Sequence, residues 1–167
     1  NLVDIYALGG SGTGPFAPLS LDIPPGTAQW ARDFFAPYGG QRMPWIAVQV
    51  GASDPMKAWR PELFGQTLAA LSRQTPVGYV FIGTESERKA IETAQMAYRQ
   101  AGGRGPLCDA VGRTTLPQLA AVLAQCRLLL TNDTGPMHLA VGVGTPVIDL
   151  SVGHVDFRET GPYGPGH

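Results

Sequence analysis

The sequence has few cysteines, no long apolar run and no excess of charge of either sign, and each shortage excludes a class of protein. Its two cysteines, Cys108 and Cys126, provide neither a disulfide framework nor a zinc-ligand spacing, so we expect a reduced, cytoplasmic setting. The uncharged apolar stretches are shorter than the ~18 residues that a membrane-spanning helix needs. Twelve Lys and Arg residues against 13 Asp and Glu residues give a net charge of −1, without the basic stripe typical of nucleic-acid-binding proteins. We therefore expect no nucleic-acid partner.

What the sequence has in abundance is glycine and proline, with 22 and 15 of its 167 residues. Their combined share is roughly twice the usual ~12% and indicates many turns. A hydrophobic content of 44% excludes wholesale disorder, and the length is typical of one domain. Because the chain begins at Asn1 instead of Met and stops at His167 in a Gly- and Pro-rich stretch, we expect it to be a piece of a longer protein.

The regularity of the pattern changes near residue 45. Residues 1–44 are irregular, with a short strand expected from Leu19 to Ile23 and a short helix from a Thr27 cap to Phe35. We assign 1–44 to an interdomain linker and the end of a preceding domain that is absent here. Residues 45–167 are predicted to form one nucleotide-sugar-binding domain.

From residue 45 onward, short apolar runs alternate with segments that have helix signals. The predicted strands are 45–50, 78–82, 107–111, 128–131 and 147–150. The predicted helices are 61–73, 84–101, 115–126 and 135–143. Continuous apolar strands joined by short helical crossovers are typical of a parallel sheet covered on both faces. The fold class predicted is α/β, with a Rossmann-like doubly wound parallel sheet.

Polar residues follow each predicted strand, where the ligand of such a sheet binds. They are Ser53, Asp54 and Lys57; Gly83, Thr84 and Glu85; Gly112, Arg113, Thr114 and Thr115; Asn132, Asp133, Thr134, Gly135 and His138; and Ser151, Gly153 and His154. Gathered at one edge, these residues favour a binding site, although loops are polar in any protein.

The sharpest of these segments is 132–138, between an apolar strand and a helix. The unpaired N–H groups of a helix N-terminus bind anions without any basic residue, and Gly135 leaves room for a phosphate. Thr134 and His138 are four residues apart and so share one helix face. The alternative is a plain N-cap by Asp133 or Thr134 and a surface His138.

Lys57 and Glu85 are the remaining charged candidates. A lysine ammonium beside a helix N-terminus neutralises a diphosphate without a metal, whereas the alternative is a solvated surface lysine. Glu85 is placed like the acidic residue that binds ribose hydroxyls in dinucleotide folds, or it is a favourable charge at a helix start. The histidines lack metal-ligand spacing, and no G-x-S-x-G elbow supports a hydrolase triad. We expect no metal site.

Four stretches resemble one enzyme family. They are Val50-Gly51-Ala52-Ser53 with Lys57-Ala58-Trp59-Arg60-Pro61-Glu62; Phe81-Ile82-Gly83 with Glu85 and Glu87; Thr131-Asn132-Asp133-Thr134-Gly135-Pro136-Met137-His138-Leu139-Ala140 with Gly144-Thr145-Pro146-Val147; and Thr160-Gly161-Pro162-Tyr163-Gly164-Pro165. Together they resemble glycosyltransferase family nine, the ADP-heptose:lipopolysaccharide heptosyltransferases. The match extends from about residue 45 to the end, and the third stretch is the most diagnostic. Ala52 departs from the family, which often has a second hydroxyl residue there, so one phosphate contact is expected to be missing.

The resemblance implies that the chain is the C-terminal half of a GT-B glycosyltransferase and assigns roles to its residues. Lys57, Asp133 and His138 would be catalytic. The residues implied to bind the donor are Ser53 and Lys57 at the diphosphate, Glu85 at the ribose, Thr114 and Thr115 at the base, the Thr134 and Gly135 amides at a phosphate, and Asp133 and His138 at the sugar or phosphate.

The function implied is a metal-independent inverting transfer of heptose from ADP-heptose to the lipopolysaccharide inner core, without a cofactor. The family keeps its general base in an N-terminal acceptor domain, so this chain alone is expected to bind donor weakly and transfer nothing. The expected partners are the nucleotide-sugar donor, that missing domain and the lipopolysaccharide core at the inner face of the inner membrane. Two alternatives stay open: another GT-B enzyme or epimerase that uses a different nucleotide sugar, and a non-catalytic nucleotide-binding module.

Overall fold

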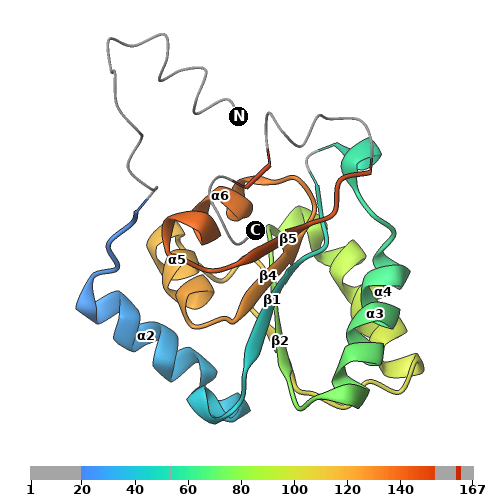
Figure 1. Cartoon of the computed structure of the whole chain (residues 1–167), viewed down its shortest axis with the longest axis horizontal. Helices are drawn as coiled ribbons and strands as arrows, with labels where there is room; N and C mark the ends of the chain where they lie inside the picture. The colour runs from blue at the N-terminus through green and yellow to red at the C-terminus, as the bar shows by residue number, and fades with distance from the viewer. Residues whose placement is uncertain (1–19, 53, 153–160, 163–167) are drawn as a thin grey trace, which may run out of the picture.

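The computed structural model describes residues 20–52, 54–152 and 161–162, and its centre is a five-stranded parallel sheet (Figure 1). The strands are β1 (Trp45–Gln49), β2 (Gly78–Ile82), β3 (Leu107–Asp109), β4 (Leu128–Thr131) and β5 (Val147–Asp149). Their order in the sheet is β3-β2-β1-β4-β5, and every pairing is parallel. All five strands lie within two residues of their predicted bounds, so the parallel sheet is confirmed.

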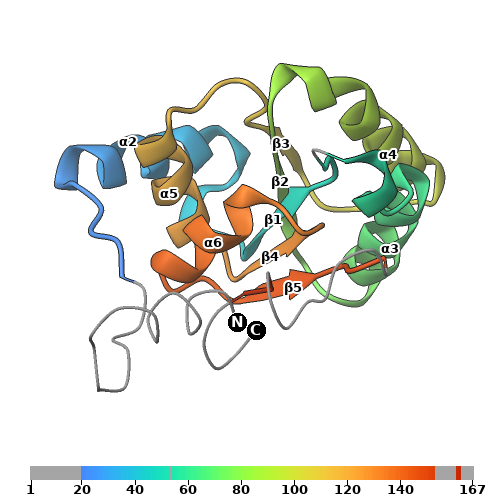
Figure 2. The same ribbon diagram turned by 90° about the horizontal axis from the view of Figure 1, so that it is seen from above.

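Helices cover both faces of the sheet (Figure 2). The two on one face are α3 (Pro61–Gln74) and α4 (Arg88–Gln100); those on the other are α2 (Pro25–Phe35), α5 (Leu116–Ala124) and α6 (Gly135–Gly142). Short 3-10 helices are η1 (Ala36–Tyr38), η2 (Gly40–Arg42), η3 (Pro55–Lys57) and η4 (Glu85–Glu87). The doubly wound arrangement predicted from the alternation is therefore confirmed.

The strand β1 is apolar along most of its length because its two faces belong to two different cores. On β1, Trp45 and Ala47 are buried with α2, α5 and α6, whereas Ile46 and Val48 are buried with α3 and α4. A sheet exposed on one side would have shown alternating polar residues instead.

Capping boxes stand at the start of two helical segments. The Thr115 hydroxyl accepts the Gln118 N–H at 3.4 Å, and the Gln118 side chain accepts the Thr115 N–H at 2.9 Å. The Thr84 N–H likewise donates to Glu87 Oε2 at 2.6 Å, but the turn that follows is the 3-10 helix η4, and α4 itself begins at Arg88.

The strand expected within 19–23 is wrong for the residues described, because 20–24 have no regular structure. The alternating pattern is too short to pair and runs directly into Pro24-Pro25, where the missing N–H groups prevent strand pairing. The helix begins at Pro25, with Pro24 at the N-cap position, so Thr27 lies inside the first turn and is not the N-cap. Phe35 of α2 is buried against Trp45, with ring centroids 4.7 Å apart, so part of the segment assigned to a linker packs into the core of the sheet domain.

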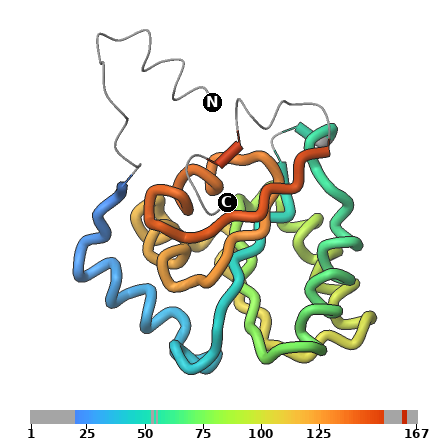
Figure 3. The backbone as a smooth tube through the Cα atoms, in the orientation of Figure 1, coloured from blue at the N-terminus to red at the C-terminus, as the bar shows by residue number. Residues whose placement is uncertain are grey.

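The strand order has its switch point at the carboxyl ends of β1 and β4, and we call this region the crevice. The chain moves outward from β1 to β2 and β3 on one side and to β4 and β5 on the other. At such a reversal, the connections after the two central strands leave toward opposite faces, and ligands bind between them. The two connections here are 50–60 after β1 and 132–134 after β4 (Figure 3).

Candidate functional site

Asn132 joins the two connections at the crevice. Its side chain is fully buried; Nδ2 donates to the carbonyl oxygens of Val50 at 2.8 Å and Gly51 at 3.3 Å, and Oδ1 accepts the Trp59 N–H at 3.0 Å. An asparagine amide has two donor hydrogens and one carbonyl oxygen, so both of its ends are engaged. Sequence reasoning had included Asn132 only as a member of a motif, although it fixes the loop after β1 to the loop after β4.

Lys57 and Asp133 meet across this crevice. The Nζ–Oδ2 distance is 3.1 Å, and their side chains are 28% and 14% exposed. The turn that carries Lys57 is built by Asp54, whose Oδ1 accepts the Met56 N–H and whose carbonyl accepts the Lys57 N–H, both at 2.9 Å. Lys57 is therefore not a freely solvated lysine, and two of the predicted catalytic residues lie together.

The start of α6 borders the ion pair. Gly135 is the first residue of this helix and is exposed; its N–H has no partner within the helix, and a Cβ placed on it would meet no atom within 4 Å. Pro136 has no N–H, and the Met137 N–H donates to the Thr134 carbonyl at 3.1 Å. The helix start therefore has open space and a free main-chain donor at Gly135, although positions 136 and 137 add none.

The predicted shared helix face of Thr134 and His138 does not form, because Thr134 is the N-cap of α6 and has an extended backbone. The Thr131 hydroxyl donates to the Asn132 carbonyl at 2.7 Å, so the Thr134 hydroxyl, 3.0 Å from Thr131 Oγ1, is the donor of that second bond. This bond directs the Thr134 hydroxyl toward the sheet, while His138 is exposed. That both residues contact one ligand stays a prediction.

An apolar cavity of about 400 Å³ lies beside the start of α6. Its lining residues are Leu21, Leu116, Leu119, Gly135, Pro136, His138 and Leu139. Leu116 is 74% exposed and Leu21 42%, and together with the other apolar lining residues they form an exposed apolar surface at this cavity. Leu116 directly follows Thr114 and Thr115, the pair predicted to lie against a base.

Glu85 lies beside this loop and is bound by an arginine. Both of its carboxylate oxygens accept from Arg88, which lowers the pKa of Glu85 below its usual value. Arg88 also donates to Asp109 Oδ2 and to the Val111 carbonyl, each at 3.1 Å. A Cβ on Gly112 would lie 2.9 Å from Glu85 Oε2, so Glu85 adjoins the loop of Thr114 and Thr115. It belongs to the β2–β3 side of the sheet and takes no part in the Lys57–Asp133 pair.

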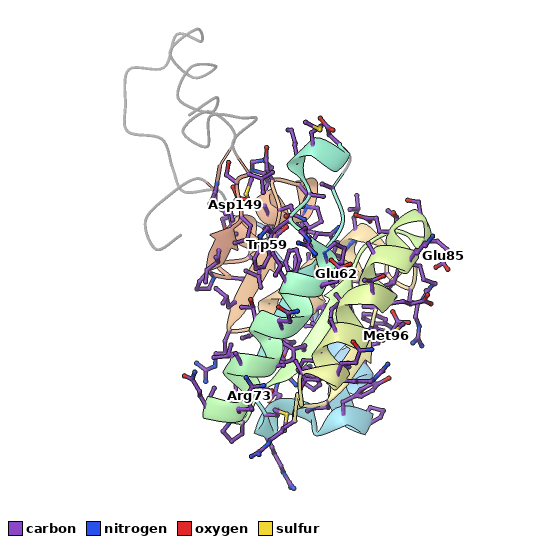
Figure 4. The ribbon with its side chains drawn as sticks, turned by 90° about the vertical axis from the view of Figure 1, so that its right-hand side faces the viewer. Trp59, Glu62, Arg73, Glu85, Met96 and Asp149 are labelled. Carbon is purple, nitrogen blue, oxygen red and sulfur yellow. The ribbon has the colours of Figure 1, made fainter. Side chains whose placement is uncertain are left out.

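Asp149, the last residue of β5, is a site residue that sequence reasoning missed. Burial and the nearby Asp133 carboxylate raise its pKa above the usual range, and His138 and Lys57 act in the opposite direction. Figure 4 shows Asp149 at the same end of the ribbon as Trp59 and opposite to Arg73. The sequence signal for Asp149 is an acidic residue at the end of an apolar run, within the predicted fifth strand. The crevice therefore holds two carboxylates beside its lysine and is not simply electropositive.

Some expectations fall outside the part of the chain that the structure describes. Ser53, predicted to hold a diphosphate, and His154 are among the residues left undescribed. Within residues 20–52, 54–152 and 161–162, no three His, Cys, Asp or Glu side chains gather as they would around a metal ion. No helix in these ranges is long and apolar enough to cross a bilayer.

Comparison with known proteins finds one family that matches this chain. The sequence model of glycosyltransferase family 9 (heptosyltransferase) matches residues 19–166. The lipopolysaccharide core heptosyltransferase OpsX of Haemophilus influenzae is 46% identical over 123 residues, which are 71% of this chain and 33% of that protein. The chain thus spans about a third of the length of the curated relatives it matches.

Two solved structures share the fold. A family 9 glycosyltransferase of Veillonella parvula is 26% identical with a TM-score of 0.80, over 96% of this chain and 45% of that one. The ADP-heptose lps heptosyltransferase II of Escherichia coli is 24% identical with a TM-score of 0.73, over 90% of this chain and 44% of that one. The expected fold, a Rossmann-like half of a GT-B glycosyltransferase, is thereby confirmed.

Proposed function

The chain belongs to glycosyltransferase family 9, and from this premise we propose that its crevice binds the nucleoside diphosphate part of a nucleotide-sugar donor. The donor is ADP-heptose, and the reaction is an inverting transfer of heptose to the lipopolysaccharide inner core, without a bound metal. The observation that carries the proposal is the Lys57–Asp133 pair beside the open start of α6, at the switch point of the sheet.

The ion pair presents Lys57 in place before a ligand arrives. Asp133 holds the ammonium group at 3.1 Å, so the flexible lysine loses less conformational freedom when a diphosphate replaces or shares that partner. The Gly135 N–H and the positive end of the helix dipole supply a second favourable contact for a phosphate. A carboxylate already in contact with Lys57 also competes with the ligand, which is one reason to expect weak binding by this chain alone.

The apolar cavity is a fitting site for the base. Leu116, Leu119 and Pro136 offer apolar surface to the faces of a purine, and the exposed Leu116 would be covered by it. Glu85 lies next to the loop of Thr114 and Thr115, so a ribose placed near that loop has a carboxylate at hand for its hydroxyls. Base, ribose and diphosphate then follow one another along the carboxyl edge of the sheet.

Charge at the leaving group gives these residues a catalytic role. In the transfer, an acceptor hydroxyl forms a bond to the anomeric carbon as the bond from that carbon to the diphosphate oxygen breaks, and the electron pair stays on the diphosphate. Lys57 and the start of α6 therefore interact more strongly with the departing group than with the intact donor, which lowers the barrier. Asp133 acts by positioning Lys57, and His138 lies on the exposed side of the helix where the sugar or phosphate would be.

The acceptor side of the reaction belongs to another domain. A group in that domain removes the proton from the acceptor hydroxyl, and the lipopolysaccharide core is presented there, at the inner face of the inner membrane. We accordingly expect this chain alone to bind donor and to transfer nothing.

Titration with ADP, UDP and GDP by NMR, in the millimolar range, tests the proposal. Wild-type chain is expected to bind ADP with chemical-shift changes around Gly135, and Lys57→Ala to bind it at least about tenfold more weakly, since one charge-assisted contact is lost. Lys89→Ala is the matched control, because Lys89 is the other lysine of the sequence and is exposed on α4. Equal binding by Lys57→Ala and wild type, or no binding of any of the three nucleotides, would refute the proposal.

A further inference from the structure

Three polar residues form a row across the carboxyl ends of adjacent strands. Gln49 of β1 is in register with Thr131 of β4, and Thr131 with Asp149 of β5. Residues in register on parallel strands point to the same face of a sheet, here the face that α5 and α6 cover. The residues two positions earlier on these strands are apolar and buried in one core, so the row marks where that core ends and the crevice begins.

Both outer members of the row have an oxygen without a partner. Gln49 Nε2 donates to Glu87 Oε1 at 2.7 Å, but Gln49 Oε1 is buried and accepts nothing; Asp149 Oδ1 is buried and unpartnered as well. The Thr131 hydroxyl between them is engaged with Asn132 and Thr134. Buried acceptors in native proteins nearly always have a donor, and an exception points to a missing partner such as a ligand.

Of the two residues, Asp149 is the more exposed and lies at the crevice, although its Oδ1 atom is itself buried. Gln49 is only 2% exposed, whereas Asp149 is half-buried and interacts electrostatically with Lys57, Asp133 and His138 at the crevice. Adjacent strands are about 5 Å apart, so Asp149 lies roughly one strand spacing from the end of β4, where α6 and the diphosphate site begin.

We propose that Asp149 is a specificity-determining contact for the donor sugar, whose hydroxyl group donates a hydrogen bond to the unpartnered carboxylate oxygen. This inference rests on the proposed function. A fully ionised diphosphate has no hydrogen to donate and repels a carboxylate, and the ammonium of Lys57 is already bound to Asp133. The sugar, which is joined directly to the diphosphate, brings hydroxyl donors to the same place.

This contact lets the site distinguish the intact nucleotide sugar from the free nucleoside diphosphate. A site whose buried acceptor is satisfied only by a substrate hydroxyl discriminates strongly against ligands that lack it. Asp149 should thus favour the nucleotide sugar over the free nucleoside diphosphate, from which it gains nothing. Once the sugar has been transferred, the same carboxylate favours release of the nucleotide product by repulsion.

The test compares the affinities of ADP-heptose and ADP for Asp149→Ala and Asp149→Asn. Asp149→Ala is expected to bind ADP-heptose at least about tenfold more weakly than wild type, while its affinity for ADP stays within about twofold or rises. Asp149→Asn keeps the shape of the side chain and should lose part of the ADP-heptose affinity, which guards against a folding defect as the cause. Glu62→Gln removes a half-exposed carboxylate beside Arg60 (Figure 4) and controls for the change in net charge.

Each outcome decides between the two proposals. Unchanged binding of ADP-heptose by both Asp149 variants, or an equal loss for ADP-heptose and ADP, would overturn the sugar contact without contradicting the proposed function. Wild-type chain that binds neither ligand would overturn the proposed function itself.

Discussion

Replacing Asn132 by alanine tests how the site is held together. The change removes three hydrogen bonds of a fully buried side chain, two to the Val50 and Gly51 carbonyls and one from the Trp59 N–H. At about 1 kcal/mol net for each bond, Asn132→Ala should lower the free energy of unfolding by about 3 kcal/mol. For a domain of this size, that loss corresponds to a fall in Tm of about 6–12 °C.

Asn132→Asp separates the hydrogen bonds from the volume of the side chain. The carboxylate keeps an acceptor for the Trp59 N–H but faces two carbonyl oxygens that the amide hydrogens had satisfied. Burial and these oxygens should raise the pKa of the new acid. Its proton then restores one donor, so the variant's instability relative to wild type should be greatest at neutral pH and diminish as the pH falls through the raised pKa.

Urea unfolding at neutral and acidic pH measures both effects. Gln66→Ala, which removes an exposed amide on α3, is the matched control and should change the unfolding free energy by less than about 0.5 kcal/mol. If Asn132→Ala were no more destabilising than this control, or Asn132→Asp were insensitive to pH, Asn132 would not be the connection between the two loops that we describe.

Three further changes have expected outcomes. Gly135→Ala should leave the free energy of unfolding unchanged or raise it by up to about 1 kcal/mol, because its Cβ meets open space, yet ADP should bind more weakly in titrations since the methyl group occupies the proposed phosphate position. Gly65→Ala should cost about 1–3 kcal/mol in urea unfolding, because a Cβ there would lie 2.2 Å from the Ala94 carbonyl oxygen, between α3 and α4. Asp149→Asn should be more stable than wild type at neutral pH. The raised pKa of Asp149 makes its ionisation destabilising, so the advantage should shrink on acidification; an advantage independent of pH between about 4 and 7 would contradict that.

The elements of this fold were predictable because their signals are local. Apolar runs marked the five strands to within two residues, and Thr115 is the N-cap of α5, where a helix was expected to start. The error at 20–24 has the same origin: an alternating pattern favours a strand, but no neighbouring strand pairs with it there, and a pattern of five residues cannot show that. Phe35 shows a second limit: its packing against Trp45 joins residues of the predicted linker, 1–44, to the core of the sheet.

The site was predictable only in part. The segment from Asn132 to His138 was identified because a helix start after a buried strand has a known chemistry. The unpartnered oxygen of Asp149 was not foreseeable, since an acid at the end of a strand is satisfied or orphaned according to what surrounds it. Likewise, Glu85 was expected at a ribose, a role that stays a prediction, but its binding by Arg88 depends on where Asp109 and Val111 lie.

The sequence by itself determined an α/β domain with parallel strands and polar carboxyl-end loops, because these features follow from residues a few positions apart. Only the tertiary structure decided that β1 and β4 are neighbours, and therefore that Lys57 meets Asp133 across 76 positions of the chain. Strand order is set by how the two cores pack against the whole sheet, and no local pattern encodes that choice. The crevice and its chemistry exist because β1 and β4 pair at the centre of the sheet.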